Sequence, residues 1–234
     1  MTESPRRDEL AARLTAVRER ISAACEAAGR KPEDVTLIAV TKTFPASDVR
    51  LLSGLGVRNF GENRDAEAAP KAALCADLDL VWHFIGQLQT NKAASVARYA
   101  TFVHSVDRAR LIRALGAAAR RAGRVIECLI EVSLDGDPAR GGAPAGEVPG
   151  LADALMAEPG LVLAGVMAIA PRGMPPADAF ATLLDSAAVV RAVRPAATVI
   201  SAGMSGDLEA AIAVGATHVR IGTALLGDRK ARVR

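Results

Sequence analysis

Aromatic side chains, cysteines and long apolar runs are all scarce in this chain of 234 residues. Only 3% of the residues are aromatic, and no apolar run is long enough to span a membrane. The first ten residues, MTESPRRDEL, are polar and do not read as a signal peptide. We therefore expect a soluble, cytoplasmic protein without membrane contact.

The three cysteines, Cys25, Cys75 and Cys128, are too few and too scattered for a disulfide framework or a zinc site. We interpret them as reduced thiols of the core. Paired carboxylates at a catalytic spacing and clusters that resemble metal ligands are also missing. The net charge is only +3, which is weak support for a nucleic-acid partner. The sequence thus indicates neither a metal site nor nucleic-acid binding.

Apolar segments alternate with helical patterns along the chain. We expect eight strands, at residues 35–43, 57–63, 80–86, 101–107, 125–134, 161–170, 197–203 and 218–225. This alternation is typical of a parallel sheet covered by helices, and eight units indicate an α/β fold closed into a (β/α)8 TIM-type barrel. An open doubly wound sheet is the alternative, which we weigh lower because no GxGxxG motif follows an early strand.

An extra helix is expected before the barrel, within residues 1–30, because apolar residues recur there on one helical face. These residues are Leu10, Leu14, Val17, Ile21 and Ala24. No linker divides the chain, so we expect a single domain, 1–234, with its barrel in 35–227. The glycine- and proline-rich segment 135–150 is predicted to be a long loop after the fifth strand.

Lys42 ends an apolar strand in LIAVTKTFP (37–45), where a lysine either reaches water or is held for chemistry. Other expected strands also end in polar residues, and in a barrel these ends meet at one mouth. Besides Lys42, the candidate binding residues are Asn63, His83, Ser201, Gly203, Ser205, Arg220, Gly222 and Thr223. For two of them a structural role is the alternative to ligand binding: His83 could orient a neighbouring strand end, and Asn63 could cap a helix. Glu62 is interpreted as a partner for a buried cation.

The segments SAGMSGD (201–207) and RIGTALLG (220–227) are rich in glycine and hydroxyl groups. Glycine lets the backbone approach a ligand closely, and free N–H groups at helix starts bind anions. In TIM barrels the loops after the last two strands often bind phosphate. A lysine held among other cations is a good nucleophile toward carbonyls. A phosphorylated aldehyde such as pyridoxal 5′-phosphate (PLP) would suit both ends of this site.

Several motifs, in their order, resemble the pyridoxal phosphate homeostasis protein family. They are AVTKTFP, FGEN, WHFIGQLQTNK, GVMAI and GMSGDLEAAIAVGATHVRIGTALLG, which together extend over residues 35–227. The resemblance implies a barrel like the N-terminal domain of alanine racemases. It also implies that PLP forms a Schiff base with Lys42 and that Arg220 faces the pyridine nitrogen. The residues implied to bind or line the phosphate are Ser201, Gly203, Ser205, Gly222 and Thr223.

The chain departs from this family pattern at three places. Ala202 stands where the family usually has methionine, and Arg64 stands where an aromatic residue often follows the asparagine of FGEN. Arg140 replaces a lysine in the loop after the fifth strand. Any cofactor-handling role of that lysine is therefore in question here.

An arginine beside the pyridine nitrogen disfavours its protonation, which makes the ring a poorer electron sink. The second base of the racemases is a tyrosine from another domain, whereas Tyr99, the single tyrosine here, lies in a predicted helix. We therefore expect a PLP carrier for vitamin B6 homeostasis that supplies apo PLP-dependent enzymes without robust catalysis. A fold-type III PLP enzyme, such as a small amino-acid racemase, is the alternative, followed by a phosphate-binding barrel enzyme without PLP. A monomer or weak dimer is expected.

Overall fold

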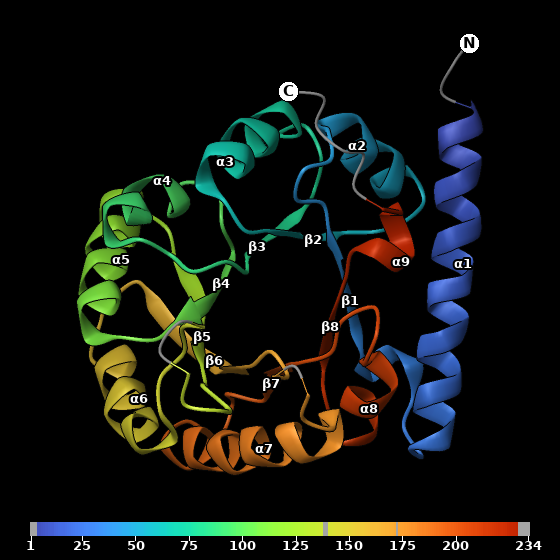
Figure 1. The fold of residues 1–234 in the computed structure, drawn as a ribbon. Helices are drawn as coiled ribbons and strands as arrows, with labels where there is room; N and C mark the ends of the chain where they lie inside the picture. Colours follow the sequence, from blue (N-terminus) through green and yellow to red (C-terminus); the bar gives the residue numbers. More distant parts are fainter. Residues whose placement is uncertain (1–3, 138–139, 172, 229–234) are drawn as a thin grey trace.

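The computed structural model describes residues 4–137, 140–171 and 173–228, and within them eight parallel strands close into a barrel (Figure 1). The strands are β1 (Thr36–Val40), β2 (Asn59–Glu62), β3 (Val81–Phe84), β4 (Phe102–Val106), β5 (Ile126–Glu131), β6 (Leu161–Met167), β7 (Val199–Ser201) and β8 (His218–Ile221). Each strand pairs with the next, and β8 closes the barrel against β1. The TIM-type barrel predicted from the alternating pattern is confirmed.

Helices surround this barrel (Figure 1). They are α1 (Ser4–Ala27), α2 (Ala46–Gly54), α3 (Asp65–Leu74), α4 (Ala93–Val96), α5 (Ala109–Arg121), α6 (Val148–Met156), α7 (Pro176–Val193), α8 (Leu208–Ala213) and α9 (Thr223–Leu226), with 3₁₀ turns η1 (Pro32–Asp34), η2 (Thr90–Lys92) and η3 (Ala145–Glu147). Among the described residues, none of these helices is both long and apolar enough to cross a membrane.

The helix α1 lies outside the barrel and packs against α2, α8 and α9 (Figure 1). All five apolar residues that predicted this helix are buried. They share one core with side chains of β1, β2 and β8 and with Leu225 and Leu226 of α9. The extra helix therefore covers the seam at which the last strand meets the first.

Two elements differ from the predicted bounds, and one helix contains a proline. The segment 218–225 is not one strand, because the chain turns at Gly222 and α9 begins at Thr223, which lets its two leucines enter the core beneath α1. Pro70 lies inside α3 without ending it, although proline removes one helical hydrogen bond, since the helix is held by its buried face. The loop after β5 begins and ends earlier than predicted, because β5 ends at Glu131 and α6 begins at Val148.

Candidate functional site

A cavity of about 470 Å³ opens where the strands end, a volume usual for small-molecule sites. Six of the nine predicted site residues line it: Lys42, Asn63, Ser205, Arg220, Gly222 and Thr223. Besides Lys42 and Arg220, its charged lining residues are Arg140 and Glu131, so cations outnumber carboxylates three to one. This balance favours an anionic ligand. No group of three potential ligand side chains within the described ranges is placed to hold a metal ion.

The backbone on both sides of Lys42 is anchored. On one side, Thr41 Oγ1 donates to Glu62 Oε1 at 2.6 Å, and Lys71 Nζ donates to the Thr41 carbonyl at 2.8 Å and also to Glu62. On the other, the N–H of Thr43 donates to Glu67 Oε2 at 3.0 Å. Thr43 has a φ of +71°, which is rare for a β-branched residue. Lys42 is thus presented from a tightly constrained turn.

The ion pair between Lys71 and Glu62, beside this turn, is buried. Burial raises the pKa of Glu62, while the ammonium of Lys71 and the hydroxyl of Thr41 oppose that rise. One carboxylate oxygen, Glu62 Oε2, has no hydrogen-bond partner in the described structure. The prediction that Glu62 partners a buried cation is confirmed, and the cation is Lys71 of α3.

In another part of the cavity lining, a hydrogen bond joins two loops to each other. Ser205, in the loop between β7 and α8, accepts a hydrogen bond at Oγ from the N–H of Ala224 in α9, at 3.2 Å. Arg20 of α1 donates to the Ser205 carbonyl at 3.1 Å, so the outer helix also holds this loop. Gly203 has a φ of +89°, and a Cβ there would lie 2.6 Å from the Cβ of Ala211. Only glycine therefore suits this bend.

Arg220 forms the buried part of the cavity wall. Its Nη1 donates to the Ser201 carbonyl at 2.8 Å and to Ser201 Oγ at 2.6 Å, and its Nη2 donates to the Ala168 carbonyl at 2.8 Å. These partners are neutral oxygens. Burial lowers the pKa of Arg220 to about 10, so the guanidinium remains a cation near neutral pH.

Three predicted site residues are not among those that line the cavity. Ser201 supports Arg220, and Gly203 shapes the loop that carries Ser205. His83 is buried, with Nδ1 at 2.9 Å from His104 Nε2 and Nε2 at 3.0 Å from Asn59 Oδ1. Of the two roles considered for His83, these bonds fit the orienting one.

Glu131 lines the cavity although the sequence interpretation overlooked it. Burial raises its pKa to about 7, helped by Asp107 and opposed by Arg220 and Arg140. The signal was available in the sequence: Glu131 is a carboxylate near the end of the apolar segment VIECLIEVSL, the same kind of placement that drew attention to Lys42.

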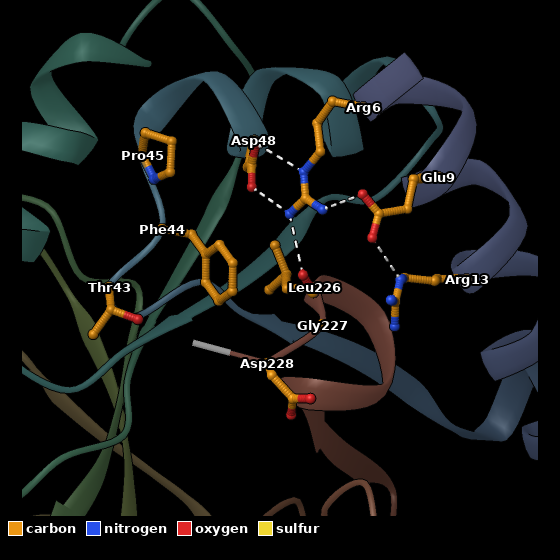
Figure 2. Close-up of a pocket in the computed structure, with 10 residues that line it drawn as sticks. All are labelled: Arg6, Glu9, Arg13, Thr43, Phe44, Pro45, Asp48, Leu226, Gly227 and Asp228. Carbon is orange, nitrogen blue, oxygen red and sulfur yellow. Dashed lines mark hydrogen bonds and ion pairs between the residues drawn. The ribbon is translucent and has the colours of Figure 1, made fainter. Parts of the chain in front are cut away.

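A larger cavity, of about 580 Å³, lies outside the barrel between α1, α2 and the end of α9 (Figure 2). Its two arginines are paired with carboxylates. Arg6 contacts Asp48 at 2.7 Å and Glu9 at 2.8 Å, and Arg13 contacts Glu9 at 3.0 Å. Because these charges already satisfy one another, we take the smaller cavity at the strand ends as the candidate site.

The comparisons with known proteins agree with this fold. Residues 12–230 match the family model described as "Alanine racemase, N-terminal domain". The pyridoxal phosphate homeostasis protein of Mycobacterium bovis is 44% identical over 97% of this chain and 95% of its own. The protein of that name in Escherichia coli is 37% identical over 95% of this chain and 97% of its own.

Solved structures of related proteins have the same fold as this chain. PipY of Synechococcus elongatus, solved with PLP bound, is 35% identical and covers 93% of this chain and 100% of its own, with a TM-score of 0.81. Alanine racemase of Corynebacterium glutamicum shares the fold, with a TM-score of 0.66 at 17% identity, over 91% of this chain and 60% of the racemase. The chain therefore belongs to the pyridoxal phosphate homeostasis protein family, whose barrel is that of the alanine racemase N-terminal domain.

Proposed function

We propose that this protein binds PLP as a Schiff base on Lys42 and supplies the cofactor to apo PLP-dependent enzymes without robust catalysis of its own. The observation that carries the proposal is that an amine, a buried guanidinium and two joined hydroxyl- and glycine-bearing loops line one cavity. The names of the relatives and the PLP in PipY support the same ligand.

The lining residues fit the parts of this cofactor. The Lys42 amine would hold the cofactor through its aldehyde carbon, and the aldehyde oxygen would leave as water. Ser205, Gly222 and Thr223 offer hydroxyl and backbone groups for the phosphate, and the cationic lining offsets its charge. Arg220 uses Nη1 and Nη2 on protein oxygens, and its Nε has no partner among the described residues. That N–H is available to the ring nitrogen.

The site is poorly equipped for racemisation. Bound PLP supplies a ring that can accept electrons from a neighbouring carbon, and a cation at its nitrogen weakens that capacity. Tyr99 does not line the cavity; its hydroxyl lies 3.4 Å from Asp65 Oδ1. Burial raises the pKa of Tyr99, so this hydroxyl stays protonated.

One observation favours the alternative, a fold-type III enzyme such as a small amino-acid racemase. Glu131 lines the cavity with a pKa raised to about 7, which suits a group that accepts and returns a proton. We expect the wild-type protein with PLP to show no sustained racemisation of a panel of L-amino acids. Turnover at ordinary enzyme rates, about 1 s⁻¹ or more, that is lost in Glu131→Gln would overturn the carrier proposal.

The phosphate contact can be tested with a ligand pair. We expect Ser205→Ala to weaken PLP binding about three- to tenfold, the worth of one hydrogen bond. The affinity of Ser205→Ala for unphosphorylated pyridoxal should equal that of the wild type. The measurement is a titration of the apo-protein followed by the Schiff-base absorbance band. Ser105→Ala is the control, because Ser105 is buried, makes no hydrogen bond through Oγ within the described structure and does not line the cavity. An equal loss for both ligands would refute the phosphate role.

A further inference from the structure

All three histidines of the sequence lie close together; His83 and His104 are buried, and His218 is partly buried. The ring centroid of His83 lies 5.1 Å from that of His104 and 6.2 Å from that of His218. Two of them, His83 and His104, belong to a continuous series of hydrogen bonds. The series begins at Arg220 on the cavity wall and ends at Asn59, where β2 begins.

Four contacts make up this series, and it crosses the barrel from β8 to β2. Arg220 Nη1 lies 2.6 Å from Ser201 Oγ, and Ser201 Oγ lies 3.0 Å from His104 Nδ1. His104 Nε2 then lies 2.9 Å from His83 Nδ1, and His83 Nε2 lies 3.0 Å from Asn59 Oδ1. We call these five residues the Arg220–Asn59 chain.

The two ends of the chain determine the direction of every hydrogen bond in it. A guanidinium can only donate, and an amide oxygen can only accept. With both rings neutral, His83 therefore carries its hydrogen on Nε2 and accepts at Nδ1. His104 must likewise carry hydrogen on Nε2 and accept at Nδ1. The hydroxyl of Ser201 donates to His104, which leaves its lone pairs to Arg220.

Both histidines of the chain must be neutral for this arrangement to exist. A second proton on His83 would place two N–H groups face to face between His83 and His104, 2.9 Å apart, and one on His104 would face the hydroxyl hydrogen that Ser201 donates. Burial lowers the pKa of both rings well below the usual value. The charged or titratable groups packed around them act in the same direction: His218 lowers the pKa of both, and His83 and Arg220 also lower that of His104.

We propose that Asn59, His83, His104 and Ser201 are positioning residues that hold Arg220 as a charged hydrogen-bond donor toward the ring nitrogen of the cofactor. The assignment rests on the proposed function, because it concerns PLP in the same cavity. Within the described residues, every hydrogen bond that Arg220 makes is to a neutral oxygen, and no carboxylate there forms an ion pair with it. Movement of Arg220 away from the cavity would leave the hydroxyl of Ser201 without its donor.

The first test needs no ligand. We expect long-range ¹H–¹⁵N NMR of the untagged apo-protein to show His83 and His104 as neutral Nε2–H tautomers from about pH 8 to about pH 5, where a free histidine would be protonated. The His83→Gln and His104→Gln variants assign the two signals. An Nδ1–H tautomer, or protonation of either ring in this pH range, would contradict the hydrogen-bond directions assigned to the Arg220–Asn59 chain.

The second test compares PLP with a carbocyclic analogue that has CH in place of the ring nitrogen. An N–H that loses its acceptor in a buried site costs about tenfold or more in affinity. We therefore expect the wild type to prefer PLP by about tenfold. His104→Leu should reduce this preference to near unity, because leucine can neither accept from Ser201 nor donate to His83. His104→Gln should retain it, because an amide can do both.

His218→Gln is the matched control, since His218 belongs to the same cluster but bonds Thr217 Oγ1 at 2.9 Å and lies outside the chain. The preference of His218→Gln for PLP over the carbocyclic analogue should equal that of the wild type. If His104→Leu does not fold, Asn59→Ala at the far end should lower the preference in the same direction by a smaller factor. A wild type that binds no PLP would sink the proposed function, whereas equal preferences in wild type and His104→Leu would sink this inference alone.

Discussion

Replacement of Lys42 by alanine is expected to abolish the covalent bond to PLP and to weaken cofactor binding about a hundredfold, which corresponds to about 2.7 kcal/mol. Lys42 is the lysine that lines the cavity in the described structure, at the mouth where Arg220 and Ser205 also lie. Without its amine no C=N bond can form, and only the phosphate and ring contacts remain. The readout is the Schiff-base absorbance band, followed by borohydride reduction and mass spectrometry of the peptides.

Reduction should attach the cofactor to the wild-type peptide that contains Lys42 and to no other peptide. Lys31→Ala is the control, because Lys31 is an exposed lysine just before η1 and does not line the cavity. It should behave as the wild type does. An adduct on a different lysine, or no adduct on the wild type, would contradict the assignment. Full labelling of Lys42→Ala would contradict it as well.

Replacement of Lys71 by methionine is expected to lower the free energy of unfolding by about 3–5 kcal/mol, the usual result of leaving one buried charge unpaired. Both side chains of the Lys71–Glu62 pair are less than one-tenth exposed. Glu62 already has one oxygen without a partner in the part of the chain that the structure describes. Chemical denaturation of the apo-protein, followed by circular dichroism, measures the loss.

The deficit of Lys71→Met should be smaller at acidic pH. Burial raises the pKa of Glu62, and removing the ammonium removes the main opposing influence. Between the unfolded and the folded pKa of this carboxyl the folded state binds more protons than the unfolded state, so stability rises as pH falls. The double variant Glu62→Gln/Lys71→Met should recover part of the loss, because a neutral amide is cheaper to bury.

An exposed ion pair provides the comparison. Arg50 and Asp77 contact each other at 2.6 Å, but both are largely exposed to solvent. Solvent screens such a pair, so Arg50→Met should cost much less than Lys71→Met. Equal losses in the two variants, or a deficit of Lys71→Met that grows on acidification, would show that Glu62 and Lys71 are not a buried ion pair.

The motifs around Lys42 and in the last two loops could be interpreted from the sequence because each is local. An apolar strand that ends in a polar residue indicates a strand end, and strand ends share one mouth in a parallel barrel. For this reason six predicted residues line one cavity although they are separated by up to 181 positions, from Lys42 to Thr223. The helix α1 was equally predictable, because its apolar residues recur with helical period.

Glu131 shows where the local pattern was insufficient: its place near a strand end was visible in the sequence, but the direction of its side chain was not. Which way a strand residue points depends on register, and a shift of one residue exchanges the two faces. The pairing of β4 with β5 shifts between Val103 and Val106, and that of β5 with β6 shifts between Cys128 and Leu129. Such irregularities are set by the packed barrel and leave no signal in the sequence.

The sequence by itself determined the barrel, the extra helix, the lysine at the mouth and the two loops rich in glycine and hydroxyl groups, because periodicity and strand-end chemistry are properties of neighbouring residues. Only the tertiary structure decided that Glu62 pairs with Lys71, that Glu131 enters the cavity, and that Asn59 is linked to Arg220 through two histidines and a serine. These contacts join residues on different strands and helices, so they depend on closure and register of the whole barrel.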